Sequence, residues 1–326
     1  MGKSQASREQ DNMKMAINLL RKGDKRTIAR FISRVENDHD HKIMEAVYPF
    51  TGSAYHIGIT GPPGAGKSTL VNAVAKVLME KKKKIGIIAV DPTSPFSGGA
   101  LLGDRVRMND LALHKNIYIR SMASRGSLGG LALKTKDALM ILDAAGMDYT
   151  IIETIGVGQV ELDIAQVCDT TIVALVPESG DSIQAMKAGL LEIADILVVN
   201  KADRQGSDRL MTELKFALEL REQESNWHYP ILQTVAVEHK GIKALVAAIE
   251  EHRLFLEKSG RLEESRKMKL MGRIKQLIED MIKVHVAEMV QHEIDVDALI
   301  DLVYQRKKNP YKIASKIART ILAARR

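Results

Sequence analysis

The sequence contains a single cysteine, few aromatic residues and no long apolar run. With Cys168 as its only cysteine, the chain forms no internal disulfide and has no metal site built from several cysteines. No stretch approaches the roughly 18 consecutive apolar residues that a membrane-spanning helix needs. The polar start, MGKSQASREQ, is not typical of a secretory signal. Together these absences predict a protein of the reducing cytoplasm that does not insert into a membrane.

The positive charge is concentrated near the C-terminus. Of a net charge of +7, residues 251–326 carry +6, with 17 Lys and Arg against 11 Asp and Glu. Such a segment can bind nucleic acid, but aromatic residues, on which bases stack, make up only 4% of the chain. The basic residues are interleaved with apolar ones at helical spacing, as on a solvated helix face. We therefore expect neither a nucleic-acid partner nor a membrane partner.

Three zones differ in their hydrophobic pattern. Residues 1–50 have apolar residues at helical spacing and predict an N-terminal helical extension. Residues 51–251 alternate short β-branched runs with helical stretches, which predicts an α/β domain with a mostly parallel sheet covered by helices on both faces. Residues 252–326 lose the strand signal and predict a helical arm, with a helix restarting at Asn309-Pro310. The predicted strands are 56–60, 85–90, 117–121, 149–153, 170–176, 196–199 and 231–235.

The segment GPPGAGKS at residues 61–68 matches the phosphate-loop pattern GxxxxGK[ST]. It follows an apolar run and opens a helical one, so backbone N–H groups at a helix N-terminus are expected to meet a phosphate chain. We expect Lys67 to neutralise the β and γ phosphates and the Ser68 hydroxyl to ligate Mg²⁺. The predicted nucleotide contacts in this segment are Gly61, Pro62, Pro63, Gly64, Ala65, Gly66, Lys67, Ser68 and Thr69.

A second motif, Asn200-Lys201-Ala202-Asp203, follows the strand predicted at 196–199 and matches NKxD. The Asp carboxylate of this motif accepts hydrogen bonds from the N1–H and the exocyclic amine of guanine, a pair of donors that adenine does not offer. We therefore expect GTP and GDP as ligands, bound through Asn200, Lys201 and Asp203. A helix-capping role for the same residues is the alternative.

Two further segments carry candidate metal and phosphate ligands. Glu153-Thr-Ile-Gly156 stands where most GTPases have Asp-x-x-Gly; Glu153 is expected to hold Mg²⁺ through water, and Gly156 to donate to the γ-phosphate. The segment from Gly156 to Glu161 is then a nucleotide-sensitive switch, in which Gln159 is either water-orienting or structural. The polar loop after the second strand offers metal-shell carboxylates at Asp91 and Asp104, and a phosphate-reaching arginine at Arg105 or Arg107. Helix capping and surface arginines are the alternative roles for that loop.

Taken together, these motifs resemble the MeaB/ArgK family, the methylmalonyl-CoA mutase-associated P-loop GTPases. The resemblance rests on GPPGAGKST, VDPTSPFSGGALLGDRVRM, ETIGVGQVE, PESGDSIQAMKAGLLEIAD and NKAD. It implies a Ras-like P-loop GTPase core with helical extensions, and a homodimer formed through the C-terminal arm. It also implies a GTP-hydrolysing chaperone, slow alone and stimulated by its partner, an adenosylcobalamin-dependent acyl-CoA mutase whose cofactor loading it gates and which it protects.

The resemblance also implies roles for individual residues. Asp91, Asp104 and Arg107 match a first switch, 153–161 a second, and 179–187 a third, in which Asp181 and Lys187 are the functional candidates. Val235-Ala236-Val237 stands where the last guanine-binding loop usually reads Ser-Ala, so only a backbone contact from Ala236 to the base is expected. The predicted catalytic residues are Lys67, Asp91, Asp104, Arg107, Glu153 and Lys187, and the predicted metal ligands are Ser68, Asp91, Asp104 and Glu153.

Three other functions compete with this interpretation. A metal-insertion GTPase of the nickel-enzyme type shares the core, but it needs a Cys/His cluster, and the nine histidines here are scattered. An ATPase or kinase linked to basic amino-acid transport is an older label of the family, against which NKAD argues. A scaffold that binds GTP and hardly hydrolyses it is the third alternative; it differs from a slow GTPase only in its rate of hydrolysis.

Overall fold

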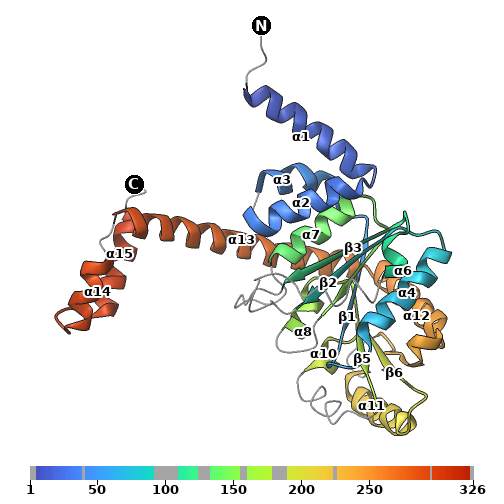
Figure 1. Ribbon diagram of the computed structural model, residues 1–326. Helices are drawn as coiled ribbons and strands as arrows, with labels where there is room; N and C mark the ends of the chain where they lie inside the picture. The colour runs from blue at the N-terminus through green and yellow to red at the C-terminus, as the bar shows by residue number, and fades with distance from the viewer. Residues whose placement is uncertain are drawn as a thin grey trace. The chain divides into compact units, whose positions relative to one another are not determined.

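The computed structural model describes residues 5–38, 41–91, 109–123, 133–154, 160–177, 189–222, 226–293 and 296–323. The chain forms two compact units, Met1–Glu263 and Glu264–Arg326. Unit 1 is built on a seven-stranded sheet with the strand order β3-β2-β4-β1-β5-β6-β7. Figure 1 shows this sheet with helices around it. None of the helices in the described ranges is long and apolar enough to cross a membrane. The three-zone division at residues 50 and 251 remains a prediction.

All neighbouring strands of this sheet pair in parallel. This confirms the predicted α/β fold with a parallel sheet, and each observed strand lies within two residues of its predicted bounds. Central parallel strands are covered on both faces, which is why they appear in the sequence as continuous β-branched runs. The strands are β1 Tyr55–Thr60, β2 Ile85–Asp91, β3 Ile117–Ala123, β4 Tyr149–Glu153, β5 Thr170–Leu175, β6 Ile196–Asn200 and β7 Ile231–Thr234.

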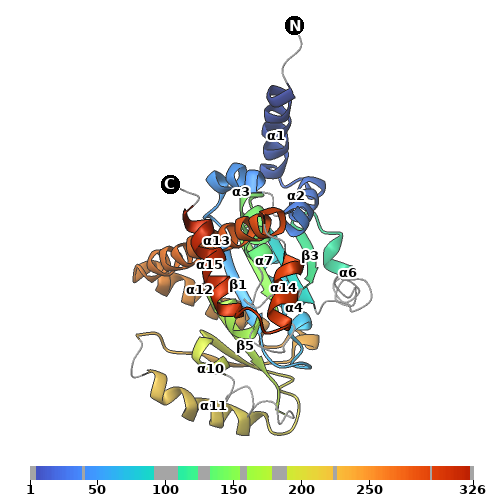
Figure 2. The same ribbon diagram turned by 90° about the vertical axis from the view of Figure 1, so that its left-hand side faces the viewer.

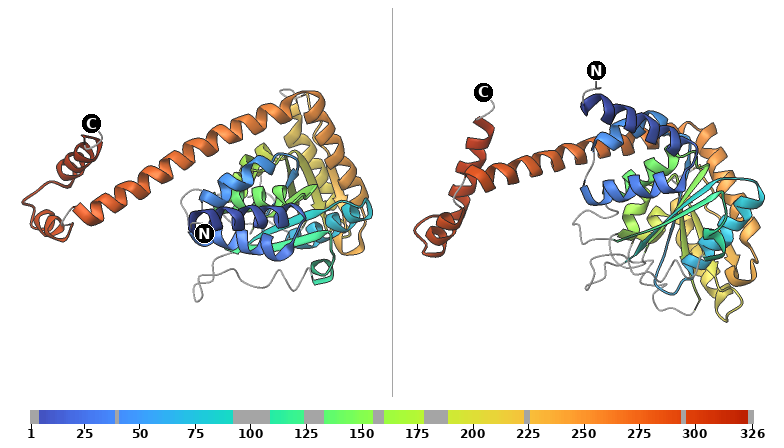
Figure 3. Two further views of the ribbon diagram at one scale, coloured as in Figure 1. Left: turned by 90° about the horizontal axis from the view of Figure 1, so that it is seen from above. Right: turned by 45° about the horizontal axis from the view of Figure 1, so that its top comes forward.

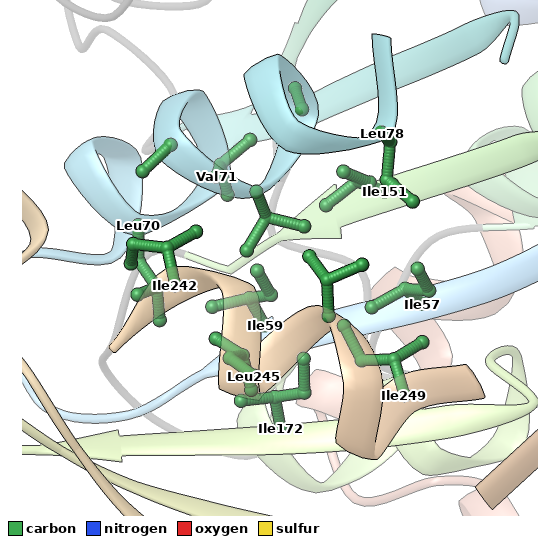
Figure 4. Packing of buried hydrophobic residues seen from close by; sticks show 14 of the residues in the cluster. Ile57, Ile59, Leu70, Val71, Leu78, Ile151, Ile172, Ile242, Leu245 and Ile249 are labelled. Atoms are coloured by element: carbon green, nitrogen blue, oxygen red, sulfur yellow. The ribbon is translucent and has the colours of Figure 1, made fainter. Parts of the chain in front are cut away.

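One face of the sheet is covered by α4 (Lys67–Glu80) and α12 (Ile242–Lys258). Because successive strand residues point to opposite faces, Ile57 and Ile59 of β1 both lie on this side. Figure 4 shows how β1, β4 and β5 meet the two helices here. The labelled side chains are Ile57, Ile59, Leu70, Val71, Leu78, Ile151, Ile172, Ile242, Leu245 and Ile249.

The other face is covered in two parts. The N-terminal helices and α7 (Leu133–Ala144) pack on Ile88, Val90 and Ile152, and α10 (Leu190–Ile193) and α11 (Ser207–Glu222) pack on β5 and β6 (Figures 1 and 2). The N-terminal helices are α1 Gln5–Arg21, α2 Lys25–Asp38 and α3 His41–Val47, and the short elements are η1 Tyr48–Phe50, α6 Asn109–Ala112, α8 Val160–Asp163, η2 Ile164–Gln166 and η3 Ala236–Glu238.

An aromatic and cationic cluster fastens α12 to the amino ends of the strands. The Arg253 guanidinium lies 5.2 Å from the ring centroid of Tyr55 and 5.8 Å from that of Tyr149. The Tyr149 hydroxyl donates to Glu250 Oε1 at 2.7 Å, and burial raises the pKa of Tyr149 to about 12. These contacts lie at the edge opposite to the one where the strands end.

The helices α14 (Val296–Tyr304) and α15 (Pro310–Ala323) belong to unit 2, and α13 (Arg261–Glu293) runs into it as one long helix (Figure 3). The predicted restart at Asn309-Pro310 is confirmed: Asn309 Oδ1 accepts from the backbone N–H groups of Tyr311 at 2.9 Å and Lys312 at 3.3 Å. Several large apolar side chains of α13 are exposed, among them Met271, Ile274 and Ile278.

Candidate functional site

The predicted motifs meet at one edge of the sheet. Parallel strands all end at the same edge, and loops there form the crevice in which α/β proteins bind ligands. β1 leads into residues 61–66, β4 into Thr154, β6 into residues 201–203 and β7 into residues 235–241. Thr154 ties two of these ends together, because its Oγ1 donates to Thr60 Oγ1 at 2.8 Å and its N–H to Ile59 O at 3.2 Å.

The loop after β1 turns sharply into α4. Gly61, Gly64 and Gly66 have φ angles of 138°, 78° and 82°, which other residues rarely adopt. A Cβ on Gly61 would lie 2.1 Å from Ala174 O, so only glycine lets the loop run against β5. Gly66 is the N-cap of α4 in left-handed conformation, and Lys67 is the first helical residue. This strand–turn–helix arrangement is the one that presents a helix N-terminus to phosphate.

The Lys67 side chain is folded into this loop. Its Nζ donates to Gly61 O at 2.7 Å and to Pro62 O at 3.0 Å, and the residue is 6% exposed. The carboxyl of Glu161, in α8, is also buried; burial raises its pKa, and the positive charge of Lys67 opposes that rise. The ammonium and a buried carboxylate therefore influence each other where the phosphates are expected.

Two predicted metal ligands lie in direct contact. Ser68 Oγ donates to Glu153 Oε1 at 2.6 Å, and Glu153 is buried at the end of β4. A hydroxyl beside a carboxylate fits Mg²⁺, which prefers oxygen ligands and keeps several waters. Asp91 ends β2 at the same edge, and only its backbone is described.

Asn200 connects the NKAD segment to the phosphate loop. Its Nδ2 donates to Ala65 O at 2.8 Å, while Oδ1 accepts from Thr234 Oγ1 at 3.0 Å and from Ala236 N at 3.2 Å. The residue is 2% exposed, so all three bonds are shielded from water. Asn200 is predicted as a nucleotide contact, but its bridge to Ala65 is not predictable from the motif, since 135 residues separate the two in the chain.

The remaining guanine-loop residues lie close by. Lys201 adopts a φ of 56°, and Ala202 N donates to Thr234 O at 3.0 Å, which holds the turn beside β7. Asp203 is exposed. Val237 is 75% exposed, whereas Val235 and Ala236 are buried. The backbone of Ala236 is expected to contact the base; its N–H donates to Asn200 Oδ1 at 3.2 Å.

Several predicted site residues lie outside the described residues. They are Asp104, Arg107, Gly156 and Lys187, together with Arg105, Gln159 and Asp181. Their predicted roles remain predictions. Within the described part of the chain, no group of three or more His, Cys, Asp or Glu side chains is placed to hold a metal ion.

Several known proteins are similar to this chain in sequence or in fold. The family model described as methylmalonyl-CoA mutase-associated GTPase MeaB matches residues 28–291. A putative GTPase of Pyrococcus abyssi is 47% identical over 311 residues, covering 94% of this chain and 96% of that protein. The GTPase ArgK of Escherichia coli is 35% identical over 282 residues, covering 83% of this chain and 85% of that protein. A crystal structure described as an LAO/AO transport system kinase superposes with a TM-score of 0.67 at 26% identity, covering 99% of this chain and all of that one.

Proposed function

Because the chain belongs to the MeaB family of methylmalonyl-CoA mutase-associated GTPases, we propose that it is a cytoplasmic, GTP-hydrolysing chaperone of an adenosylcobalamin-dependent acyl-CoA mutase. The family match confirms the resemblance drawn from the motifs. The observation that carries the proposal is the meeting of the phosphate loop, Glu153 and the NKAD segment at one sheet edge. The sequence holds no cobalamin or acyl-CoA motif, so the substrate chemistry belongs to a partner.

In this proposal each described site residue has one task in GTP hydrolysis. The loop 61–66 and the first turn of α4 hold the phosphate chain through backbone N–H groups. Lys67 leaves the carbonyl groups of Gly61 and Pro62 and turns to the β and γ phosphates. Asp203 selects guanine. Phosphoryl transfer depends mainly on positioned charge, which these groups supply.

A magnesium ion completes the proposed site. Ser68 and Glu153 would hold it, with Asp91 and Asp104 as further proposed ligands. Bound there, Mg²⁺ would supply positive charge that offsets the negative charge of the phosphates. The Ser68–Glu153 hydrogen bond holds these two side chains side by side.

The proposed route to the partner runs through three segments that follow β2, β4 and β5 in the sequence. These are 92–103, 156–161 and 179–187, which we assign as nucleotide-sensitive switches, with Asp181 and Lys187 in the third. If the GTP and GDP states bind the mutase differently, the mutase must change nucleotide affinity by the same factor. In this proposal hydrolysis is slow in the isolated chain and is stimulated by the mutase. Because reciprocity holds for binding and not for rates, the hydrolysis rate need not change by the same factor as the affinity.

We also propose that the protein is a homodimer through residues 252–326. The exposed side chains of Met271, Ile274, Ile278 and Met281 recur every three or four residues along α13 and form one apolar stripe. A stripe of this kind on a soluble protein marks an interaction surface. The division into a helical extension (1–50), a GTPase domain (51–251) and a dimerisation arm (252–326) follows this assignment.

The proposal is tested by mixing the protein with each cobalamin-dependent mutase of its source organism. GTP turnover, complex formation and cobalamin transfer are measured with GTP, with GDP and without nucleotide. We expect at least one mutase to raise turnover and to load cofactor in a nucleotide-dependent way. If all three readouts are indifferent to every mutase and to the nucleotide, the chaperone function is wrong.

A further inference from the structure

Four turns of unit 1 meet at the edge of the sheet where the strands begin, opposite to the phosphate loop. They join α1 to α2, α4 to β2, α6 to β3 and α7 to β4. Because β2 lies between β3 and β4, the last three turns are neighbours, and the Asp148 N–H donates to Lys84 O at 2.9 Å. The first turn joins them through Lys25, whose Nζ donates to His114 O at 2.8 Å.

The four turns, residues 21–26, 81–84, 113–116 and 145–148, are strongly basic, and we call them the basic edge. They contain nine Lys and Arg but only two Asp, which gives a net charge of +7. Unit 1 as a whole carries a net charge of only +1, so its remaining residues carry −6. The fold therefore separates charge that is nearly balanced in the sequence. The basic residues are Arg21, Lys22, Lys25, Arg26, Lys81, Lys82, Lys83, Lys84 and Lys115, all exposed except Lys25 and Lys83, which are partly exposed.

Both aspartates of the basic edge already take part in hydrogen bonds of the fold. Asp24 accepts from Thr27, and Asp148 Oδ2 accepts from the Lys84 N–H at 2.8 Å, while Asp148 Oδ1 lies 3.7 Å from Lys83 Nζ. A run of lysines within one turn is usually only a solvated segment. Here, however, separate segments bring their cations to the same edge, where like charges repel. A surface of this kind attracts a partner of opposite charge.

We propose that the basic edge binds an acidic surface of a partner protein, in every nucleotide state. Leu113, which is 93% exposed and adjoins His114, adds an apolar side chain that a protein surface can cover and a phosphate backbone cannot. The four turns contain no Phe, Tyr or Trp on which bases could stack. The phosphate loop and the NKAD segment lie at the other edge of the sheet, so nucleotide and partner use different residues.

The test reverses the charge of one exposed lysine in each of three turns. This edge variant combines Lys22→Glu, Lys81→Glu and Lys115→Glu. A control variant makes the same change in net charge at exposed lysines of α3, α11 and α12. It combines Lys42→Glu, Lys215→Glu and Lys243→Glu.

The probe is a fluorescent peptide of repeating Glu-Glu-Leu, and binding to the full chain is followed by anisotropy. A Glu-Glu-Ser peptide, duplex DNA and vesicles that contain phosphatidylserine are compared with it. Each titration is run with GDP, with a non-hydrolysable GTP analogue and without nucleotide.

We expect the unsubstituted protein and the control variant to bind the Glu-Glu-Leu peptide alike. The edge variant should bind it on the order of a hundredfold more weakly at low salt, because three attractions become repulsions. The affinity should fall as salt is raised, since exposed charges are screened, and should not depend on the nucleotide. Leu113→Ser should weaken binding of the Glu-Glu-Leu peptide about fivefold and leave that of the Glu-Glu-Ser peptide unchanged.

Three results would overturn the proposal. Equal peptide binding by the edge and control variants would mean that the position of the charges is irrelevant. Tighter binding of DNA or of the vesicles than of the Glu-Glu-Leu peptide, lost in the edge variant, would assign the basic edge to nucleic acid or to lipid. Release of the peptide by the GTP analogue would place the peptide at the nucleotide site.

Thermal unfolding of each variant shows that the compared proteins are folded. Glutamine at the same three positions removes the charges without reversing them, and should weaken binding about tenfold. This second variant decides the question if the edge variant does not fold. The inference goes beyond the proposed function: neither a mutase nor GTP hydrolysis enters these titrations, so their outcome is independent of the chaperone proposal.

Discussion

At the scale of single residues, the side-chain amide of Asn200 forms hydrogen bonds to three segments at the edge where the strands end. Ala65 belongs to the phosphate loop, Thr234 to β7 and Ala236 to the turn after it. The amide thus fixes the phosphate loop relative to the segment that we propose binds the base. A ligand whose two ends bind at once requires its two subsites to lie at a fixed distance.

We therefore predict that Asn200→Ala destabilises unit 1 by about 3 kcal/mol, because the buried Ala65 carbonyl and two buried donors lose their partner. Urea unfolding monitored by circular dichroism measures this change. The control is Asn37→Ala, an exposed asparagine of α2, which should change stability by less than about 0.5 kcal/mol. Equal stabilities of the two variants would remove the bridging role from Asn200.

The second prediction concerns the base. Asp203→Asn should shift preference from guanine toward xanthine nucleotides, whose 2-oxo group accepts where the guanine amine donates. Because Asp203 is exposed, the change should leave stability unaltered. Competition titrations with GTP, xanthosine triphosphate and ATP measure the preference. If ATP competes with GTP equally in the unsubstituted protein, the guanine assignment is wrong and the transport-kinase alternative gains support.

The third prediction concerns the metal. Glu153→Ala and Ser68→Ala should each slow Mg²⁺-dependent hydrolysis by about a hundredfold, since both remove an oxygen that would position the ion. GDP affinity should stay nearly intact in Glu153→Ala. Single-turnover hydrolysis and GDP titration measure the two effects separately. Unchanged Mg²⁺-dependent turnover in Glu153→Ala would contradict the metal assignment.

At the scale of elements, local signals allowed the strands and some helix starts to be predicted. The seven strands were predictable because each is a short run rich in β-branched and other apolar residues, and α15 because Asn309-Pro310 is a local capping signal. The strand order was not predicted, since it depends on pairings between residues such as Ile57 and Ile151 that are far apart in sequence.

The site was predictable to the same extent. The motifs could be located, and the shared edge of a parallel sheet brings them together. The burial of Glu161, the Asn200 bridge and the position of Arg253 beside two tyrosines arise only from tertiary packing. No local sequence pattern carries these features.

One element-scale prediction concerns the start of α2. Asp24 caps this helix: its Oδ2 accepts from Thr27 Oγ1 at 2.7 Å and from Thr27 N at 2.8 Å. We expect Asp24→Ala to cost about 1 kcal/mol at neutral pH. The Thr27 hydroxyl and then the Thr27 N–H hold the pKa of Asp24 below its ordinary range.

The sign of the pH effect follows from this lowered pKa. The carboxylate stabilises the fold above the unfolded-state pKa, and this contribution is lost as the pH falls through the lower folded-state value. The stability difference between Asp24→Ala and the unsubstituted protein should therefore be full at pH 7 and shrink below about pH 4. Urea unfolding at several pH values measures it. A difference that does not change with pH would mean that the cap acts without its charge.

At the scale of the whole molecule, the exposed apolar stripe of α13 leads to a prediction about assembly. We expect the protein to sediment as a dimer, and the double variant Ile274→Glu with Ile278→Glu to sediment as a monomer, because two buried charges oppose an apolar interface. Lys275→Ala, an exposed neighbour on the same helix, is the control and should leave the dimer intact. Analytical ultracentrifugation measures the mass. A monomeric unsubstituted protein would contradict the proposed homodimer.

The position of β1 in the middle of the sheet has a consequence for folding during synthesis on the ribosome. β1 and the phosphate loop are made early, but the partners of β1 are β4 and β5, whose residues follow about a hundred positions later. Chains grow at roughly 5–20 residues per second, so for several seconds an apolar strand has no neighbour to pair with. Gly61 cannot pack against Ala174 until β5 has left the ribosomal exit tunnel. The nascent chain therefore acquires its phosphate loop late, and a holding chaperone bound near residues 55–60 would protect it in that interval.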